Sequence, residues 1–279
     1  MSLASKIILK GVRTIYRGLN SLEKHVSTNE TYSYLDEQSI INSYLQKLKI
    51  EKGYAVDIAA GDGVSMSNTY SLYKNDWRGL AVEFDSDKFA KLSNTYSDFK
   101  SVNLSKCMVT PENVLSILKA HGTPSDFDFL NLDIDGYDYF VLNEILKNYR
   151  PKLICVEINE KIPPPIKFTV KWDPGYVWAT DHFYGQSISQ VNTLVSQYKY
   201  SLVELHYNNA FLIPTEISPS LSLTPELAYQ EGYLEKKDRK SKFPWNSNME
   251  DVLQMSPDEA LNFINNFFRK YKGKFEASI

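Results

Sequence analysis

The sequence predicts an α/β fold built on a mostly parallel sheet, and three observations predict it. Short apolar runs suited to buried strands alternate with segments of helical periodicity between residues 50 and 200. A glycine-containing turn follows the first of these runs, within residues 54–63, where a ligand-binding strand would lead into a helix. A short link at residues 207–209 separates two later strand-like runs, which favours an antiparallel hairpin that closes the sheet.

The elements follow one another regularly up to residue 158. A helix over 36–50 precedes the first strand, which ends at Asp57. Four further strands and three helices then alternate: strands at 80–84, 101–104, 127–132 and 153–158, and helices at 87–95, 111–118 and 137–147. Because such continuous apolar strands are buried on both sides, we expect helices to cover both faces of the sheet.

The alternation breaks after residue 158. A proline-rich segment at 162–166 and an aromatic segment at 172–184 predict a loop that serves as a lid or substrate wall, the alternative being an irregular surface insertion. A helix at 187–198 and the hairpin strands at 201–206 and 210–213 follow. Beyond Pro214 the chain becomes polar and helical, and a capping box at Ser256 to Glu259 begins one helix.

Three regions are therefore expected. Residues 1–49 form an N-terminal helical segment, 50–214 the sheet-containing domain, and 215–279 a C-terminal helical extension. The first 22 residues carry Lys6, Lys10, Arg13 and Arg17 opposite apolar positions, as in a basic amphipathic helix. Packing on the domain and attachment to a membrane surface, or a transit-like peptide, remain alternative interpretations of this helix.

Composition excludes several classes of protein. With 43% hydrophobic and 23% charged residues the chain is an ordinary globular protein, and no apolar stretch is long enough to span a bilayer. A formal charge of -3 and a pI near 5.9 provide no field that would attract nucleic acid. Of the two cysteines, Cys155 lies in an apolar run and is expected to be a buried thiol, so we expect a reducing, cytoplasmic location.

The glycine turn and the next strand carry the pattern of an adenosine-binding site. Gly61 and Gly63 allow the main chain to approach a ligand closely, and Glu83 at the end of the next strand can accept hydrogen bonds from a ribose diol. Asp57, at the end of the first strand, belongs to the same edge. The dinucleotide spacing G-x-G-x-x-G is absent, which favours a nucleoside cofactor without pyrophosphate, such as S-adenosylmethionine.

Polar side chains also follow the fourth and fifth strands. Asp133 and Asp135 end the fourth strand, whereas Glu157 and Asn159 end the fifth. Because neighbouring strands lie about 4.8 Å apart, these four oxygen-bearing groups can converge on magnesium or manganese. The alternatives are that Asp135 caps the following helix and that Asp133 holds the ammonium group of the cofactor without a metal.

His182 is the histidine that falls within the aromatic loop expected above the strand ends. Its ordinary pKa suits the acceptance of a hydroxyl proton near neutral pH, so base catalysis is one interpretation and a structural role is the other.

At these residues the chain resembles the class I S-adenosylmethionine-dependent methyltransferases, and specifically the FkbM-like branch, over residues 50–214. The residues that carry the resemblance are 56–63, 81–85, and above all the aspartate-rich segment 128–138 with the following 150–159. The resemblance implies a Rossmann-like, seven-stranded sheet whose last strand is antiparallel. It also implies that Phe84 lies against adenine and that Asn103, at the end of the third strand, approaches the adenine edge. Ala59 departs from the family pattern, which usually has a glycine there.

The resemblance implies methylation of a hydroxyl group on a sugar, glycan or natural product. Such a reaction requires removal of a proton, for which His182 is the candidate base; if His182 is structural, the proton leaves through Asp133, Asp135 or a metal-bound route. Two alternatives belong to other classes of protein. One is a nicotinamide-dependent oxidoreductase, which the missing third glycine disfavours. The other is a cofactor-binding module without catalysis that works as the partner of another enzyme. The oligomeric state stays open.

Overall fold

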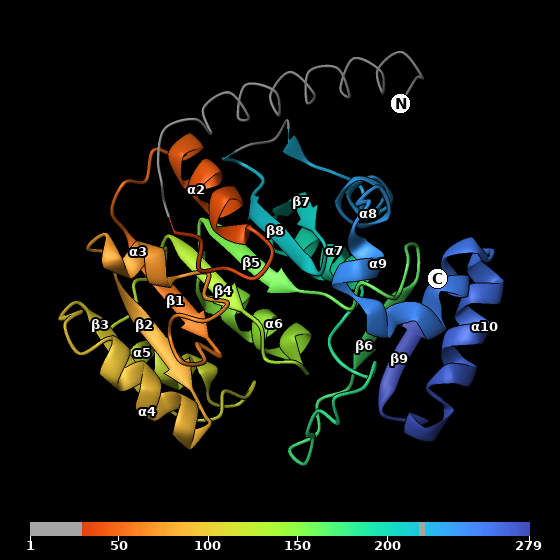
Figure 1. Cartoon of the computed structure of the whole chain (residues 1–279), viewed down its shortest axis with the longest axis horizontal. Coiled ribbons are helices and arrows are strands. Elements are labelled where there is room, and N and C mark those ends of the chain that lie inside the picture. The colour runs from red at the N-terminus through yellow and green to blue at the C-terminus, as the bar shows by residue number, and fades with distance from the viewer. Residues whose placement is uncertain (1–29, 218–220) are drawn as a thin grey trace.

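The computed structural model describes residues 30–217 and 221–279, so the predicted basic helix within residues 1–22 lies outside the described part. Seven strands form one sheet in the order β3-β2-β1-β4-β5-β8-β7 (Figure 1). Their bounds are β1 Tyr54–Ile58, β2 Arg78–Glu83, β3 Val102–Lys106, β4 Phe129–Leu132, β5 Leu153–Glu157, β7 Tyr200–His206 and β8 Asn209–Pro214. The strands β1 to β5 pair in parallel, and β8 runs antiparallel to both β5 and β7. The predicted mostly parallel sheet with its closing hairpin is confirmed.

Helices cover both faces of this sheet, as predicted. One face is covered by α2 Glu37–Lys47, α3 Tyr70–Lys74 and α4 Ser86–Thr95, and the other by α5 Val114–Ala120, α6 Asp138–Asn148 and α7 Ile188–Gln197. Side chains alternate between the two cores along each strand, so that Ala55 joins the first and Val56 the second. Cys155 is fully buried in the first core, as expected. The helix predicted over 111–118 begins only at Val114, because the Asn113 side chain accepts from Thr110 N and forms a turn there.

The C-terminal region, which we call the tail (residues 221–279), lies beside the sheet at the end of β5 (Figure 1). Its elements are α8 Pro225–Tyr229, the π-helical turn η2 Gln230–Leu234, α9 Arg239–Lys242, the 3₁₀ segment η3 Pro244–Gln254, α10 Pro257–Phe267, the 3₁₀ turn η4 Arg269–Tyr271 and the strand β9 Phe275–Ser278. The capping box predicted at Ser256 is present, with Glu259 accepting from the Ser256 backbone N–H at 2.9 Å.

The segment between β5 and α7, which we call the roof loop (residues 159–187), is more regular than its sequence predicts. It contains a strand, β6 Lys167–Val170, which pairs antiparallel with β9 of the tail. The sequence did not reveal this strand because its pairing partner lies about a hundred residues further along the chain. The roof loop and the tail therefore form one layer at the carboxyl end of β5.

Candidate functional site

The glycine turn after β1 leaves open space at one of its two glycines. Gly61 has φ +60°, and an added Cβ would meet no atom within 4 Å. Gly63 has φ +86°, but a Cβ there would lie 2.7 Å from the side chains of Leu92 and Tyr96. Gly61 therefore offers room for a ligand, whereas Gly63 is required by packing against α4. Ala59 also takes a left-handed conformation, with φ 70°, which costs an alanine about 1 kcal/mol.

Glu83 lies at the end of β2 and is tied to this turn. One carboxylate oxygen accepts from Gly61 N and the other from Asp85 N, both at 2.8 Å. Glu83 is 3% exposed, so a ribose diol reaches its remaining lone pairs only if the turn opens slightly. The neighbouring Phe84 is 63% exposed, which is unusual for a phenylalanine and leaves an apolar ring uncovered at the same edge.

Asp57 is buried and bonded within the protein. Its carboxylate accepts from Thr69 Oγ1 and, at 2.8 Å, from Asn131 Nδ2. Burial raises its pKa. Asp57 thus joins α3, β1 and β4 beneath the glycine turn, and its direct contact with a cofactor stays a prediction.

Our placement of Asn103 is wrong. It lies near the beginning of β3, where it pairs with Leu80 in the middle of β2, and its side chain is exposed. Lys106 is the β3 residue that pairs with Glu83 and ends the strand. The strand extends two residues beyond the predicted end, which the sequence did not reveal because the residues of β3 are mostly polar. Asn103 therefore lies away from the end of β3, which is at the edge where ligands bind in such sheets.

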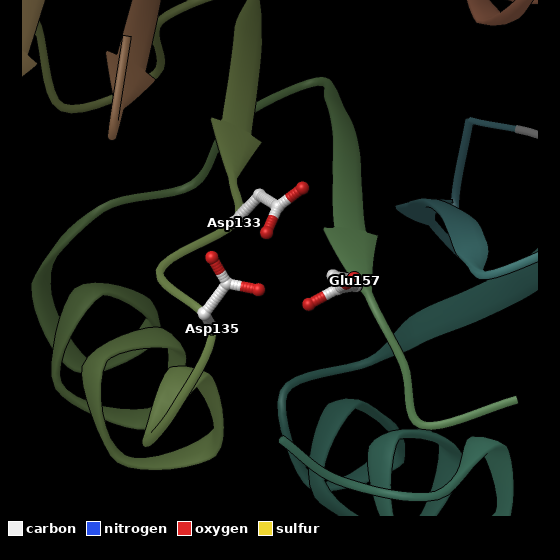
Figure 2. Close-up of side chains that lie close together, drawn as sticks. All are labelled: Asp133, Asp135 and Glu157. Atoms are coloured by element: carbon white, nitrogen blue, oxygen red, sulfur yellow. The ribbon is translucent and has the colours of Figure 1, made fainter. Parts of the chain in front are cut away.

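Three carboxylates meet at the adjacent strand ends, as predicted. Asp133 and Asp135 follow β4, Glu157 ends β5, and one oxygen from each lies within 4.8 Å of the others (Figure 2). Asp133 and Asp135 are half-buried, whereas Glu157 is only 7% exposed. Oxygen ligands at this spacing suit magnesium or manganese.

Burial raises the pKa of all three groups. Burial and the neighbouring Asp135 raise the pKa of Asp133 well above its usual range, and burial and Asp133 do the same for Glu157. Burial also raises the pKa of Asp135, although Lys88 and Lys161 oppose that change. Like charges this close cannot all ionise alone, so the cluster either holds protons or binds a cation.

The turn that carries the two aspartates is held by a residue that we did not single out. The buried carboxylate of Asp138 accepts from Ile134 N at 2.9 Å and from Gly136 N at 3.1 Å. Burial raises the pKa of Asp138 to about 6. Asp138, and not Asp135, therefore organises the beginning of α6, and Asp135 is left with φ 52° and its carboxylate toward the cluster (Figure 2).

Asn159 holds the roof loop. Its Nδ2 donates to the carbonyl oxygens of His182 and Tyr184, both at 2.9 Å, and its backbone N–H donates to Gln186 at 2.7 Å. Its Oδ1 is buried without a partner among the described residues. The side chain thus fixes the path of the roof loop above the end of β5.

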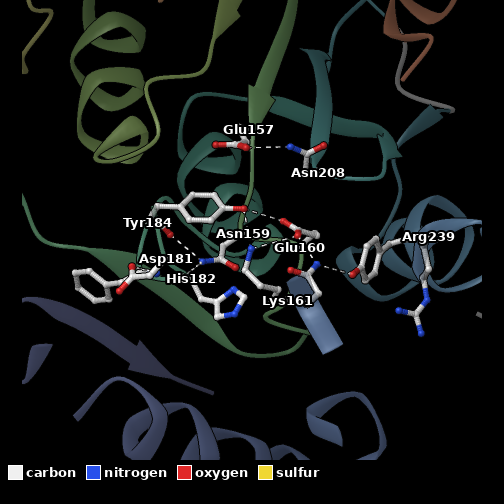
Figure 3. A network of polar contacts seen from close by, with 12 residues as sticks. Glu157, Asn159, Glu160, Lys161, Asp181, His182, Tyr184, Asn208 and Arg239 are labelled. Carbon is white, nitrogen blue, oxygen red and sulfur yellow. Dashed lines mark hydrogen bonds and ion pairs between the residues drawn. The ribbon is translucent and has the colours of Figure 1, made fainter. Parts of the chain in front are cut away.

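His182 is not brought together with the carboxylates. Its Nε2 lies 2.9 Å from Asn248 Oδ1 of the tail, and its ring lies 5.7 Å from that of Phe267. Figure 3 shows the ring directed away from Glu157, with Asn159 between them. An amide oxygen only accepts, so Nε2 carries the proton; burial and Lys161 lower the pKa of His182.

The roof loop also contains a buried ion pair between adjacent residues. Lys161 Nζ lies 3.2 Å from Glu160 Oε1 and donates to Tyr184 Oη at 2.8 Å (Figure 3). Asn246 of the tail donates to the same Glu160 oxygen at 2.6 Å. The tail is therefore bonded to the segment that directly follows the carboxylate cluster.

Comparison with known families finds one match. Residues 99–202 match the methyltransferase FkbM domain. The chain thus contains a methyltransferase FkbM domain over these residues. It is an S-adenosylmethionine-dependent methyltransferase, and the seven-stranded sheet is the Rossmann-like fold that the resemblance implies.

Solved structures similar to this chain include the N-terminal domain of EvdMO1 with S-adenosylhomocysteine bound. That likeness has 10% identity and a TM-score of 0.43, and covers 72% of this chain and 95% of that one. The CurJ carbon methyltransferase is similar with 11% identity and a TM-score of 0.40, covering 63% of this chain and 52% of that one. No curated protein matches the sequence.

The FkbM match includes Asp133, Asp135 and Glu157 but not the glycine turn or the tail. Sequence reasoning missed Asn208, which lies just beyond the match and donates to Glu157 at 2.9 Å. The one sequence feature that could have indicated Asn208 was its place in the hairpin link, and this feature becomes informative only once β8 is known to pair with β5.

Among the residues that the structure describes, no helix has the length and apolar character needed to cross a membrane.

Proposed function

We propose that this methyltransferase transfers the methyl group of S-adenosylmethionine to a hydroxyl group of a sugar, glycan or natural product. The observation that carries the proposal is the set of three carboxylates next to the glycine turn, at the edge where α/β sheets bind ligands. Open space at Gly61 and the uncovered ring of Phe84 support a cofactor on the neighbouring strands, with Glu83 toward its ribose. A methyl donor and an oxygen acceptor would then meet above β4.

The acceptor oxygen attacks the methyl carbon while the bond from that carbon to sulfur breaks, so the sulfonium becomes a neutral thioether. The enzyme has to align the two groups and remove one proton. We assign the proton to Asp133, because it lies in the cluster at the end of β4 and because burial and the neighbouring Asp135 raise its pKa, which makes its carboxylate a stronger base. His182 is the competing assignment, although its ring is bonded to the tail.

The same carboxylates fit a divalent cation. Asp133, Asp135 and Glu157 offer only oxygen, and Glu157 Oε2 is buried without a partner among the described residues. Magnesium or manganese bound there would lower the pKa of an acceptor hydroxyl and help to orient it. Asn159 contributes less directly, because its amide nitrogen is committed to the roof loop.

The test is the release of S-adenosylhomocysteine over a panel of glycans, nucleotide sugars and free sugars, with the Asp133→Asn/Asp135→Asn protein as the control. The proposal is supported by an acceptor that only the wild-type protein methylates, with the new methyl group located on oxygen by mass spectrometry.

Titration calorimetry with S-adenosylmethionine and NAD addresses the oxidoreductase alternative, which tight NAD binding would favour. Cofactor binding without turnover on any acceptor would favour a non-catalytic module.

A further inference from the structure

Asn208 connects the hairpin between β7 and β8 to the end of β5. Its Nδ2 donates to Glu157 Oε1 at 2.9 Å, across 51 positions in the sequence (Figure 3). Its backbone carbonyl accepts from Ile158 N at 2.7 Å, and the next residue, Asn209, is the register partner of Glu157. The hairpin turn therefore holds both the backbone and the side chain at this strand end.

The amide hydrogen bond leaves the two oxygens of Glu157 in different environments. Oε1 is bonded to Asn208, whereas Oε2 is buried and has no partner within the described ranges. Figure 2 shows the Glu157 carboxyl group directed toward Asp135 and Asp133. A buried oxygen without a partner costs about 1 to 3 kcal/mol, and a cation or a bound donor would relieve that cost.

We propose that Asn208 is a positioning residue, which holds Glu157 so that Oε2 faces Asp133 and Asp135 as a ligand for a divalent cation. The inference rests on the metal site in the proposed function and adds the residue that orients it. Without the amide, the glutamate side chain can rotate away from the two aspartates that crowd it. Hydrogen bonds to metal ligands typically change metal affinity by about 10- to 100-fold when they are removed.

The experiment measures Mn²⁺ binding to the full chain in the presence of S-adenosylhomocysteine, by electron paramagnetic resonance of the free ion. Asn208→Leu keeps the approximate shape of the side chain and removes the amide. Asn265→Leu is the matched control, because Asn265 is exposed in α10 and its side chain bonds only to the carbonyl of Leu261. We expect about 10- to 100-fold weaker Mn²⁺ binding for Asn208→Leu, less than about 2-fold change for Asn265→Leu, and unchanged S-adenosylhomocysteine affinity in both.

A double-mutant cycle separates positioning from a general structural role. If Asn208 acts through Glu157, adding Asn208→Leu to Glu157→Gln weakens Mn²⁺ binding no further. A full additional loss in the double variant overturns the inference, and so does wild-type affinity in Asn208→Leu. If the leucine variant does not fold, Asn208→Ala removes the same amide without a branched side chain and takes its place in the cycle.

The outcome for the wild-type protein distinguishes this inference from the proposed function. Wild-type protein that binds no Mn²⁺ overturns the metal site and the role of Asn208 together. Methyl transfer to the acceptor panel in excess chelator would then still support the proposed methylation. Loss of Mn²⁺ binding in Asn208→Leu with an intact fold, by contrast, supports the inference whether or not an acceptor has been found.

Discussion

Phe183 of the roof loop and Tyr271 of the tail stack with their ring centroids 3.8 Å apart and their planes 12° from parallel. The Tyr271 hydroxyl also donates to Asp181, and Lys270 Nζ donates to the same carboxylate at 3.0 Å. These contacts, together with the β6 and β9 pairing, attach the roof loop to a region more than eighty residues away. The tail is thus part of the structure that surrounds the carboxyl end of β5.

Replacing Tyr271 should loosen that attachment. We expect Tyr271→Ala to lower the free energy of unfolding by about 2 kcal/mol, because it removes an aromatic stack and a hydrogen bond to a carboxylate. Limited proteolysis within residues 171–181 should become faster at the same time. Tyr271→Phe keeps the stack and should lose less than half as much; equal losses in the two variants would mean that the hydroxyl group, and not the ring, docks the tail.

Replacing Glu83 should weaken cofactor binding. Glu83→Ala removes the carboxylate proposed for the ribose and two bonds that hold the glycine turn, at 2.8 Å each. Hydrogen bonds to charged groups contribute about 1.5 to 3 kcal/mol, so the Kd for S-adenosylmethionine should rise by about 10- to 100-fold in calorimetry. Asp87→Ala, at an exposed position in α4, is the control. Unchanged affinity in Glu83→Ala would remove the assignment.

Neutralising one member of the carboxylate cluster should stabilise the cation-free protein. The pKa of Asp133 is raised in the folded state, so its contribution to stability is present at low pH and is lost as pH rises through that raised pKa. Asp133→Asn removes this loss. Its melting temperature at pH 7 in chelator should exceed that of wild type, by about 2 to 4 °C for each kcal/mol relieved, and the difference should shrink toward pH 4. A lower melting temperature at pH 7 would show that the cluster is not strained.

Cation binding should depend on pH for the same reason. Burial and mutual repulsion raise the pKa values of Asp133 and Glu157, which favours protons on the empty cluster, and a cation has to displace any proton held there. Mn²⁺ affinity should therefore rise as pH increases from 6 to 8, with a slope of up to about one decade per pH unit for each proton released. Proton release measured by calorimetry in buffers of different ionisation enthalpy gives an independent value. A pH-independent affinity would place the cation elsewhere.

Two variants separate the candidate bases. Loss of a general base lowers turnover by about 10² to 10⁴, so we expect Asp133→Asn to lose that much on an acceptor found in the panel. His182→Ala should keep turnover within about tenfold, because its ring is bonded to Asn248 and packs near Phe267. Both proteins should bind S-adenosylmethionine normally. The reverse pattern, with His182→Ala the slower enzyme, would assign the proton to His182.

The sequence by itself determined the order of strands and helices and the place of the acidic cluster. Hydrophobic periodicity depends on neighbours a few residues apart, so it predicts buried strands such as 153–158 without knowledge of the fold. Once the strands are parallel, their carboxyl ends share one edge, and Asp133, Asp135 and Glu157 must lie there. Glu83 and Gly61 lie at neighbouring strand ends for the same reason.

The tertiary structure alone decided which of these groups have partners and which face open space. Asn103 was misplaced because the polar β3 shows little periodicity, so its end could not be located. The bond from Asn208 to Glu157, the pairing of β6 with β9, and the contact of His182 with Asn248 each join segments distant in sequence. Local patterns contain no record of such contacts, because the direction of a side chain is set by whatever packs against it, and that is known only when the chain has folded.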